Sequence, residues 1–451
     1  MNRFTKKLKN IYVQSLFGTG GVSILSFILS LILFRILPAK DIGVWFFFQA
    51  SLAFVDTFRQ GFLTTTFVKF YSGSSSDRRK EILGSTWYIA TVITATFLII
   101  SLPFIINTHY IKDHTLNYFL RNFGIYMTVS LPMVIAMCVC QGELQFDKLL
   151  YIRLCQVSLL IVLVLLLYAT ENVTLNNLMY VNLISVFLTS CLVLLKGLSG
   201  VKYFFRRTKS CMKELITFGK YTVGSSISTT LFNLTNTYLI NFFLGSASVG
   251  VYNLGCRLME IVEIPLRSFV ATALPSLSKL YNEKNKGKFI EVMKQYIGSI
   301  TIVLLPFLLI AFIFADVAMK IIGGNQYDIG TKNGITAANI FRILALYSLF
   351  YPLDRFMAIA IDVIHKPEIN FIKVLIMLIV NFIACLIAVH VLGNLYGIVI
   401  GSIFPTLVAV FISYTSLQKY YTKFNLYDTL LTGYHLLRHV AIRNYKQLIV
   451  K

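Results

Sequence analysis

Four ionisable side chains lie in one apolar stretch of membrane-spanning length, residues 249–279. They are Arg257, Glu260, Glu263 and Arg267. At about 100° per residue they fall within roughly 120° of a helix, and their spacings of three and four residues let opposite charges meet. Exposing all four to lipid would cost about 10 kcal/mol. We therefore expect this face to point into the protein or towards water.

The composition indicates a polytopic membrane protein. Of 451 residues, 57% are hydrophobic and 13% are charged, whereas soluble domains carry about a quarter charged residues. Most of the seven cysteines lie in apolar runs and are expected to be core residues. The six histidines show no metal-ligand spacing, so we predict no metal site. The chain also lacks a phosphate-binding GxxxxGK[ST] loop, which argues against ATP hydrolysis by that route.

Apolar runs of about twenty residues recur along the whole chain and predict about twelve transmembrane helices. The runs fall near residues 11–37, 42–66, 83–106, 118–140, 149–169, 176–198, 216–243, 249–275, 296–321, 337–361, 370–392 and 395–417. The first run is too long for the apolar part of a signal peptide, so it is expected to remain as a span. The connections are short.

The net charge of +22 is explained by topology rather than by nucleic acid. With the N-terminus inside, about 30 of the 41 Lys and Arg fall on the cytoplasmic side and about 6 outside. This asymmetry predicts cytoplasmic termini. The basic loop that contains Lys202, Arg206, Arg207 and Lys209 then faces the inner membrane surface.

The predicted organisation has five parts: a cytoplasmic N-terminus (1–10), an N-lobe of six spans (11–198), a basic cytoplasmic linker (199–215), a C-lobe of six spans (216–417) and a basic cytoplasmic tail (418–451). In the tail, Leu430, Tyr434, Leu437 and Ala441 recur at helical spacing among basic residues. This pattern predicts an amphipathic helix on the inner membrane surface. A partner-binding tail is the alternative.

An internal repeat relates the two halves at a constant offset of 207 residues. The matched pairs are Leu37 and Leu244, Gly43 and Gly250, Val44 and Val251, Trp45 and Tyr252, and Asp56 and Glu263, with Arg59 and Arg267 equivalent to within one residue. The offset spans six helices, an even number, so the halves should insert with the same orientation about an axis along the membrane normal. We expect a central cleft flanked by the second and eighth spans.

Several short motifs, in this order along the chain, resemble one family. They are L-x(5)-G-V-[WY] after spans one and seven, ATALPSLSKLYNEKNKGK at the end of span eight, GGNQY after span nine and HKPEIN after span ten. Together they resemble the polysaccharide, or O-antigen, flippases of the multidrug/oligosaccharidyl-lipid/polysaccharide exporter superfamily, over residues of about 5–420. The resemblance implies an all-α membrane protein with two six-helix lobes in a V shape, as in MATE transporters. It also implies a flippase that works by alternating access, moving a polyprenyl-pyrophosphate-linked oligosaccharide from the inner to the outer leaflet of the bacterial inner membrane for surface polysaccharide synthesis.

The sequence departs from relatives in the superfamily at two places. Many relatives carry an acidic–basic pair in span seven, where this chain has Asn236 and Thr237. Drug exporters often use a carboxylate in span one for cation coupling, but here that span contains Gln14 and Ser15 and no acid. It also lacks the Arg–Asp pair that is typical of peptidoglycan-precursor flippases.

The predicted site consists of cations for a pyrophosphate, acids that balance them, and polar groups for sugar. A guanidinium binds phosphate through paired N–H donors. The predicted substrate-binding cations are Arg59, Arg257, Arg267, Arg355 and Lys220; the charge-balancing acids, which could also couple the lobes, are Asp56, Glu260, Glu263 and Asp354; and the weaker sugar contacts are Gln49, Asn233, Asn236, Asn241 and Tyr252. Pairing of these charges with one another, as locks between lobes, is the alternative role. For Asp354 and Arg355, which follow Pro352, a helix-end role is the alternative.

No cofactor is expected. A head group of charge −2 that moves outward in an inside-negative membrane gains up to about 4–5 kcal/mol at 100 mV, so the potential alone could drive the cycle; proton or sodium coupling is not required. The predicted partners are the lipid-linked glycan, membrane lipids, and glycan polymerase or glycosyltransferases, with the chain itself a monomer.

The rival functions are a cation-coupled small-molecule exporter, a membrane-embedded glycan polymerase or ligase, and a scaffold for glycan assembly. Short outer loops argue against the enzyme.

Overall fold

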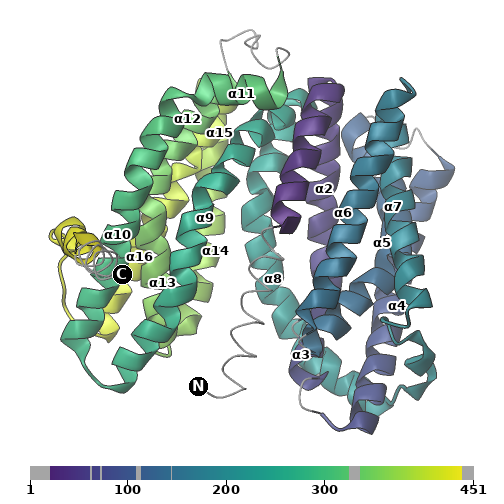
Figure 1. Cartoon of the computed structure of the whole chain (residues 1–451), viewed down its shortest axis with the longest axis horizontal. Coiled ribbons are helices and arrows are strands. Elements are labelled where there is room, and N and C mark those ends of the chain that lie inside the picture. The colour runs from purple at the N-terminus through teal and green to yellow at the C-terminus, as the bar shows by residue number, and fades with distance from the viewer. Residues whose placement is uncertain are drawn as a thin grey trace, which may run out of the picture. The chain divides into compact units, whose positions relative to one another are not determined.

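The structure is a computed structural model (Figure 1) that describes residues 21–60, 63–64, 66–71, 74–107, 113–143, 145–324 and 336–438. Its contacts divide the chain into two compact units, unit 1 (Met1–Leu234) and unit 2 (Thr235–Lys451). The boundary lies inside helix α8. Each unit is described by itself below.

Unit 1 contains helices that pack around α5, which contacts α2, α4, α6 and α7. The helices are Gly21–Ile36, α2 (Ala39–Gln60), α3 (Thr66–Tyr71), α4 (Ser76–Ile106), α5 (His114–Gly142), α6 (Phe146–Ala169), α7 (Leu175–Leu195), the 3-10 helix η2 (Val201–Arg206) and α8 (Lys209–Leu244), of which the last part belongs to unit 2. The linker predicted over 199–215 therefore contains η2 and the first turns of α8.

In unit 2, helix α9 contacts α10, α12 and α13, and α14 contacts α15 and α16. The helices are α9 (Ser246–Asn282), α10 (Lys286–Ile313), α11 (Ala315–Gly323), α12 (Ala337–Tyr347), the 3-10 helix η4 (Ser348–Phe350), α13 (Tyr351–Val363), α14 (Pro367–Leu392), α15 (Leu395–Gly401) and α16 (Ile403–Tyr420). Residues 429–438 form a further helix, the tail helix.

Within the described residues, eight helical segments are long and apolar enough to cross a membrane. They are Ser76–Ile106, Thr115–Gly142, Phe146–Ala169, Leu175–Leu195, Lys286–Ile313, Ala337–Val363, Pro367–Leu392 and Leu395–Tyr420. Four belong to each unit. The other four predicted spans are the shorter helix Gly21–Ile36 and the more polar helices α2, α8 and α9. The predicted all-helical membrane fold is confirmed, and the three more polar helices are the second span of the first predicted half and the first two spans of the second.

Side chains at the helix ends explain where several helices begin. Asp113 accepts hydrogen bonds from the N–H groups of Thr115 and Leu116 at the start of α5, and Asn285 accepts from the N–H of Lys288 at the start of α10. These oxygens satisfy donors that the first turn of a helix leaves free. Pro367 stands in the first turn of α14, where its missing N–H costs nothing. The HKPEIN motif therefore comprises the end of the turn after α13 and the first turn of α14.

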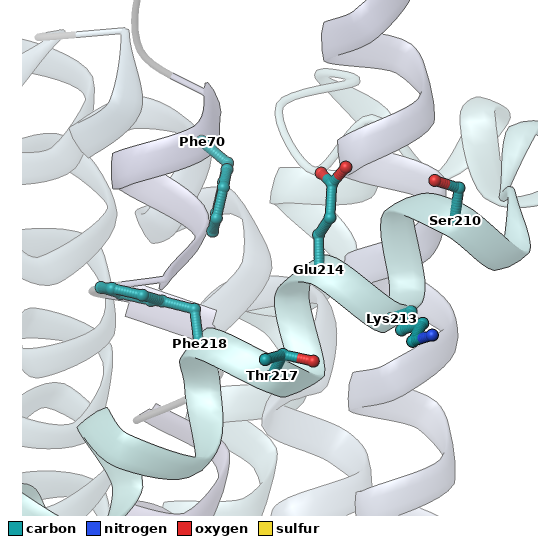
Figure 2. Close-up of a pocket in the computed structure, with 6 residues that line it drawn as sticks. All are labelled: Phe70, Ser210, Lys213, Glu214, Thr217 and Phe218. Atoms are coloured by element: carbon teal, nitrogen blue, oxygen red, sulfur yellow. The ribbon is translucent and has the colours of Figure 1, made fainter.

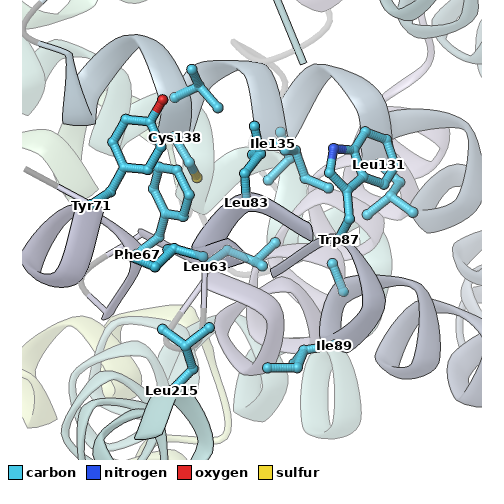
Figure 3. Packing of buried hydrophobic residues seen from close by; sticks show 14 of the residues in the cluster. Leu63, Phe67, Tyr71, Leu83, Trp87, Ile89, Leu131, Ile135, Cys138 and Leu215 are labelled. Atoms are coloured by element: carbon cyan, nitrogen blue, oxygen red, sulfur yellow. The ribbon is translucent and has the colours of Figure 1, made fainter. Parts of the chain in front are cut away.

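A hydrophobic cluster between α3, α4, α5 and the start of α8 holds unit 1 together (Figure 3). It includes Leu63, Phe67, Trp87 and Ile135, all buried, together with Leu215 of α8. The indole N–H of Trp87 donates to the Ser199 carbonyl at 2.9 Å. This bond satisfies the one polar atom of the indole, so the ring can be buried at no polar cost. The cluster thus ties the start of α8 to the body of unit 1.

The repeat inferred from the sequence falls on equivalent positions of the two units. Leu37 lies just before α2 and Leu244 ends α8 just before α9, while Gly43 and Gly250 both lie in the first turns of the helix that follows. Trp45, the partner of Tyr252, is buried. The matching pattern therefore marks the entry into the second helix of each half.

Some predictions fall on residues outside the described ranges. These residues are the N-terminus 1–10, the first part of span one with Gln14 and Ser15, most of the GGNQY segment and its continuation (325–335), and the tail from residue 439 onward.

Candidate functional site

Arg59, in the last turn of α2, is the largest fully buried side chain among the described residues, with 1% of its surface exposed. Its Nε donates to Asp56 Oδ1 at 2.7 Å, its Nη1 to the Met127 carbonyl at 2.9 Å and its Nη2 to Ser130 Oγ at 3.1 Å. Asp56 also accepts a hydrogen bond from Gln60. Every described hydrogen bond of this guanidinium is therefore internal to unit 1 and joins α2 to α5. We name Asp56, Arg59 and Ser130 the unit 1 charge cluster.

Unit 2 contains a second buried charge cluster that the sequence analysis missed. Lys373 of α14, with 4% of its side chain exposed, places Nζ 2.7 Å from Asp354 Oδ1 and 3.3 Å from Ser413 Oγ. Asp354 lies in the first turn of α13, where a carboxylate is favoured by the helix dipole. Asp354 was a predicted site residue; Lys373 was not, although a lone lysine in an otherwise apolar span predicts a buried partner. We name Asp354, Lys373 and Ser413 the unit 2 charge cluster.

The charged face predicted on α9 is exposed on unit 2. Arg257 Nη1 lies 2.7 Å from Glu260 Oε1, with 25% and 52% of their side chains exposed. Glu263 is partly exposed one turn further on. Arg267 lies in the same helix, but its side chain is outside the described set. The structure thus joins Arg257 to Glu260, as the spacing predicts.

The exposure of these charges constrains what α9 can face. Glu260 lies about 21 Å along α9 from its first residue, at 1.5 Å per residue, well inside a helix of membrane-spanning length. A carboxylate there would cost about 2.5–3.5 kcal/mol in contact with lipid. The side chain must therefore meet water or other polar groups. This is the arrangement expected of a transport pathway.

Two of the predicted sugar contacts lie together inside unit 2. Asn236 Nδ2 donates to the Tyr252 hydroxyl at 3.0 Å, and Asn381 Nδ2 donates to Asn236 Oδ1 at 3.0 Å. Asn381 is buried and lies on α14; the sequence analysis did not single it out. The cluster is neutral, and its amides already satisfy one another. It therefore joins α8, α9 and α14.

The remaining predicted site residues are scattered. Lys220 of α8 and Arg355 of α13 are exposed, and Gln49 of α2 is partly exposed. Asn241 Oδ1 is buried, with no hydrogen-bond partner among the described residues. The side chain of Asn233 lies outside the described set. The structure links none of these five to the two charge clusters through a described hydrogen bond, and their roles in substrate binding stay predictions.

An open pocket of about 460 Å³ lies elsewhere in unit 1, between α3 and the first half of α8 (Figure 2). Phe70 and Phe218 form one wall, their rings 5.8 Å apart and perpendicular. Glu214 on the rim pairs with Arg78. The lining is mostly apolar and contains none of the predicted site residues. In the described part of the chain, no group of three or more His, Cys, Asp or Glu could hold a metal ion.

The fold and the placement of charge define the class of protein to which the chain belongs. This is a multi-pass, all-helical membrane protein in which the second, seventh and eighth spans are the more polar ones. Spans that carry exposed charge are typical of membrane transporters.

The chain belongs to the family described as "Polysaccharide biosynthesis protein", whose model matches residues 32–329. It is also similar to the "Probable low-salt glycan biosynthesis flippase Agl15" of Haloferax volcanii, with 23% identity over 387 residues that cover 83% of this chain and 76% of the relative. The family resemblance seen in the sequence is thereby confirmed.

Solved structures show the same fold. The inward-facing conformation of a multidrug resistance MATE family transporter of the MOP superfamily aligns with a TM-score of 0.72 at 15% identity, covering 88% of this chain and 94% of that one. The lipid II flippase MurJ, in an inward closed conformation, aligns with a TM-score of 0.71 at 13% identity, covering 97% and 100%. The predicted MATE-like fold class is confirmed. These two proteins and the relative from Haloferax volcanii are named as transporters or flippases rather than as enzymes.

Proposed function

We propose that this protein is a flippase that moves a polyprenyl-pyrophosphate-linked oligosaccharide across the membrane by alternating access. The observation that carries the proposal is the exposed charged face of α9 in a chain of the polysaccharide biosynthesis family. The relative from Haloferax volcanii is named a glycan biosynthesis flippase, which supports the same class of substrate. The direction is from the cytoplasmic to the outer leaflet of a bacterial inner membrane, for surface polysaccharide such as O-antigen, with both termini cytoplasmic.

The α9 face has the chemistry that such a substrate requires. A pyrophosphate needs N–H donors, which Arg257 supplies in a fork that matches phosphate oxygens. In the structure, Arg257 Nη1 donates to Glu260 Oε1 at 2.7 Å. An incoming pyrophosphate would replace this carboxylate and free it to water, since half of the Glu260 side chain is already exposed. The exchange keeps the guanidinium neutralised at every stage, which keeps its desolvation cost low.

The buried charge clusters suit a different role. Arg59 and Lys373 each hold a carboxylate and a serine hydroxyl inside their own unit. Releasing either cation to substrate would leave a buried carboxylate uncompensated, at a cost of about 3–5 kcal/mol. We propose that these clusters fix the helices of each unit, while α9 contacts the substrate.

The membrane potential can drive the proposed cycle. A head group of charge −2 that leaves an inside-negative compartment gains about 4–5 kcal/mol at 100 mV. No coupling ion is then required. Collapsing the potential in vesicles should slow net transport, and an unchanged rate would rule this driving force out.

The test is transport by the purified protein in vesicles that carry polyprenyl-pyrophosphate-linked oligosaccharide in both leaflets. A membrane-impermeant lectin or glycosidase then reports the glycan on the outside. With the active protein, the glycan of the inner leaflet should also become accessible. Protein-free vesicles and vesicles with Lys279→Gln, a substitution at the exposed end of the same helix, serve as controls. Accessibility limited to the outer leaflet would contradict the proposal.

The same preparation separates the rival functions. Joined glycan chains among the products would identify a polymerase or ligase. Extrusion of a cationic dye without glycan movement would identify a small-molecule exporter. If the vesicles show neither activity, although the strain of origin requires the protein for glycan export, the result would point to a scaffold.

A further inference from the structure

The tail helix is fixed to α10 by direct backbone contact. A Cβ atom added to Gly298 would collide with the Thr429 carbonyl, and one added to Gly433 would collide with the backbone of Gly298 and Ser299. Ser299 Oγ, fully buried, donates to the Gly433 carbonyl at 3.2 Å. Two glycines thus let the helices approach more closely than any larger residues would. In Figure 1 the yellow tail helix lies beside α10.

The segment that leads into this helix is held at two more points. Lys294 Nζ of α10 lies 2.7 Å from Asp428 Oδ1, and this hydrogen bond holds the pKa of the Asp428 carboxyl below its ordinary value. The ring of Tyr421 packs 4.8 Å from that of Phe289. The chain after α16 therefore packs against unit 2 from Tyr421 through the tail helix.

The docking point lies where the surface of α10 changes from polar to apolar. Before it, Lys286, Lys288 and Glu291 are exposed. After it, the exposed side chains are Val303, Leu305, Phe307, Leu309 and Ile310. Such a change along a transmembrane helix marks the membrane–water interface. The tail helix docks at residues 294–299, at this boundary.

The tail helix has three faces at 100° per residue. Thr429 and Gly433 face α10 and are buried. The second face carries Leu430, Tyr434 and Leu431, which are 54%, 53% and 63% exposed. The third carries Asp428, Thr432 and His435. Since the first face is covered by α10, the tail helix exposes one apolar face and one polar face.

We propose that the tail helix is an interfacial lipid-binding element, with its apolar face set among the phospholipids beside α10 and its polar face in water. The apolar face continues the lipid-facing surface of α10 at the depth where amphipathic helices bind. Arg438, at the exposed end, and Lys423, before the helix, favour anionic headgroups. The acid directly before the tail helix, Asp428, is already paired with Lys294. The element would hold unit 2 at a fixed depth in the bilayer.

The test places a reporter on each of the two free faces of the full-length protein. Leu430→Cys and Thr432→Cys, which lie about 160° apart around the helix, are labelled with an environment-sensitive dye and reconstituted in vesicles, with wild-type protein giving the labelling background of its own cysteines. The label at 430 should be quenched by lipids that carry a shallow nitroxide and protected from aqueous iodide; the label at 432 should show the reverse. Removing phosphatidylglycerol from the vesicles should weaken the protection at 430.

Each other outcome overturns part of the proposal. Quenching of the label at 430 by iodide would place the apolar face in water. Protection from both quenchers, with self-quenching between labels, would assign the face to a second copy of the chain. Equal protection with and without phosphatidylglycerol would remove the preference for anionic lipid.

Docking is tested separately by Gly433→Leu against Gly287→Leu, because a side chain at Gly287 meets open space. Trypsin cleavage after the exposed Lys423 should accelerate severalfold in the first variant and remain at the wild-type rate in the second. Equal rates in both would show that the tail helix is not held by this contact. If Gly433→Leu fails to fold, the two labelled variants still decide where the faces lie.

Discussion

Helices α2 and α9 are equivalent in the repeat, yet they place their charges in opposite ways. In α2 the cation Arg59 is buried and satisfied by Asp56, Met127 and Ser130. In α9 the pair of Arg257 and Glu260 is exposed. The repeated charges thus lie inside the unit in the first half and are more exposed in the second.

In unit 2, the internal ion pair is formed by residues of other helices. Asp354 of α13 and Lys373 of α14 meet beside Ser413 of α16, so each charge cluster combines a buried cation with a carboxylate and a serine. The unit 1 pair lies within one helix and is braced by α5, while the unit 2 pair joins two helices. The charged side chains of these spans therefore differ in role because they differ in burial, not because they differ in charge.

The largest effect is expected from Arg59→Met. The substitution leaves the Asp56 carboxylate without its cation and frees the Met127 carbonyl, so the free energy of unfolding should fall by about 3–5 kcal/mol. Arg257→Met, the same change at an exposed pair, should cost no more than about 1 kcal/mol. Chemical unfolding in detergent measures both. Equal losses would show that burial does not separate the two helices.

In unit 2, Lys373→Met should lower the free energy of unfolding by about 2–3 kcal/mol, less than in unit 1 because fewer partners are lost. The double variant Asp354→Leu/Lys373→Leu should recover most of that loss, since a buried pair can be replaced by apolar groups at little cost. If the double variant is stable and still transports glycan, the cluster is structural. A stable but inactive double variant would give the pair a direct part in transport.

On α9, Arg257→Gln should reduce glycan transport about tenfold, equivalent to about 1.4 kcal/mol, because the forked donor for phosphate is lost. Its melting temperature should remain close to that of the wild type. Lys279→Gln, at the exposed end of the same helix, is the matched control and should leave transport unchanged. Full transport by Arg257→Gln would remove this arginine from the pathway.

The smallest effects concern the two serines. Ser130→Ala should cost about 1 kcal/mol, because it removes a 3.1 Å hydrogen bond to a fully buried guanidinium. Ser413→Ala should cost about half as much, since its contact with Lys373 is longer, at 3.3 Å. Thermal unfolding of both variants in one detergent compares them directly. A larger loss at Ser413 would reverse the proposed order of the two clusters.

Much of the fold could be predicted from the sequence, because membrane spans depend on apolar length. The predicted helix 149–169 corresponds to α6 and 370–392 to α14. The repeat located Asp56 and Glu263 on equivalent helices, and the spacing of Arg257 and Glu260 predicted their ion pair. These features are local in sequence, so the period of a helix is sufficient to find them.

The partners that come from distant helices could not be found in this way. The spacing of three residues suggests that Arg59 meets Asp56, but nothing local indicates that Met127 and Ser130 would complete its burial. Lys373 and Asp354 are 19 residues apart and meet only once α13 and α14 pack. Whether a side chain is buried depends on how the helices pack. The residue types alone could therefore not show which of the predicted cations are internal and which are exposed.

The central claim is that the charged face of α9 meets water while similarly exposed apolar side chains meet lipid. Glu260 and Leu309 are matched for this purpose, with 52% and 55% exposure. The measurement is alkylation of Glu260→Cys and Leu309→Cys in vesicles by a charged, membrane-impermeant thiol reagent applied from both sides. The account predicts modification of the cysteine at 260 and none at 309. An unreactive cysteine at 260 that is modified only by a lipid-soluble reagent would contradict it.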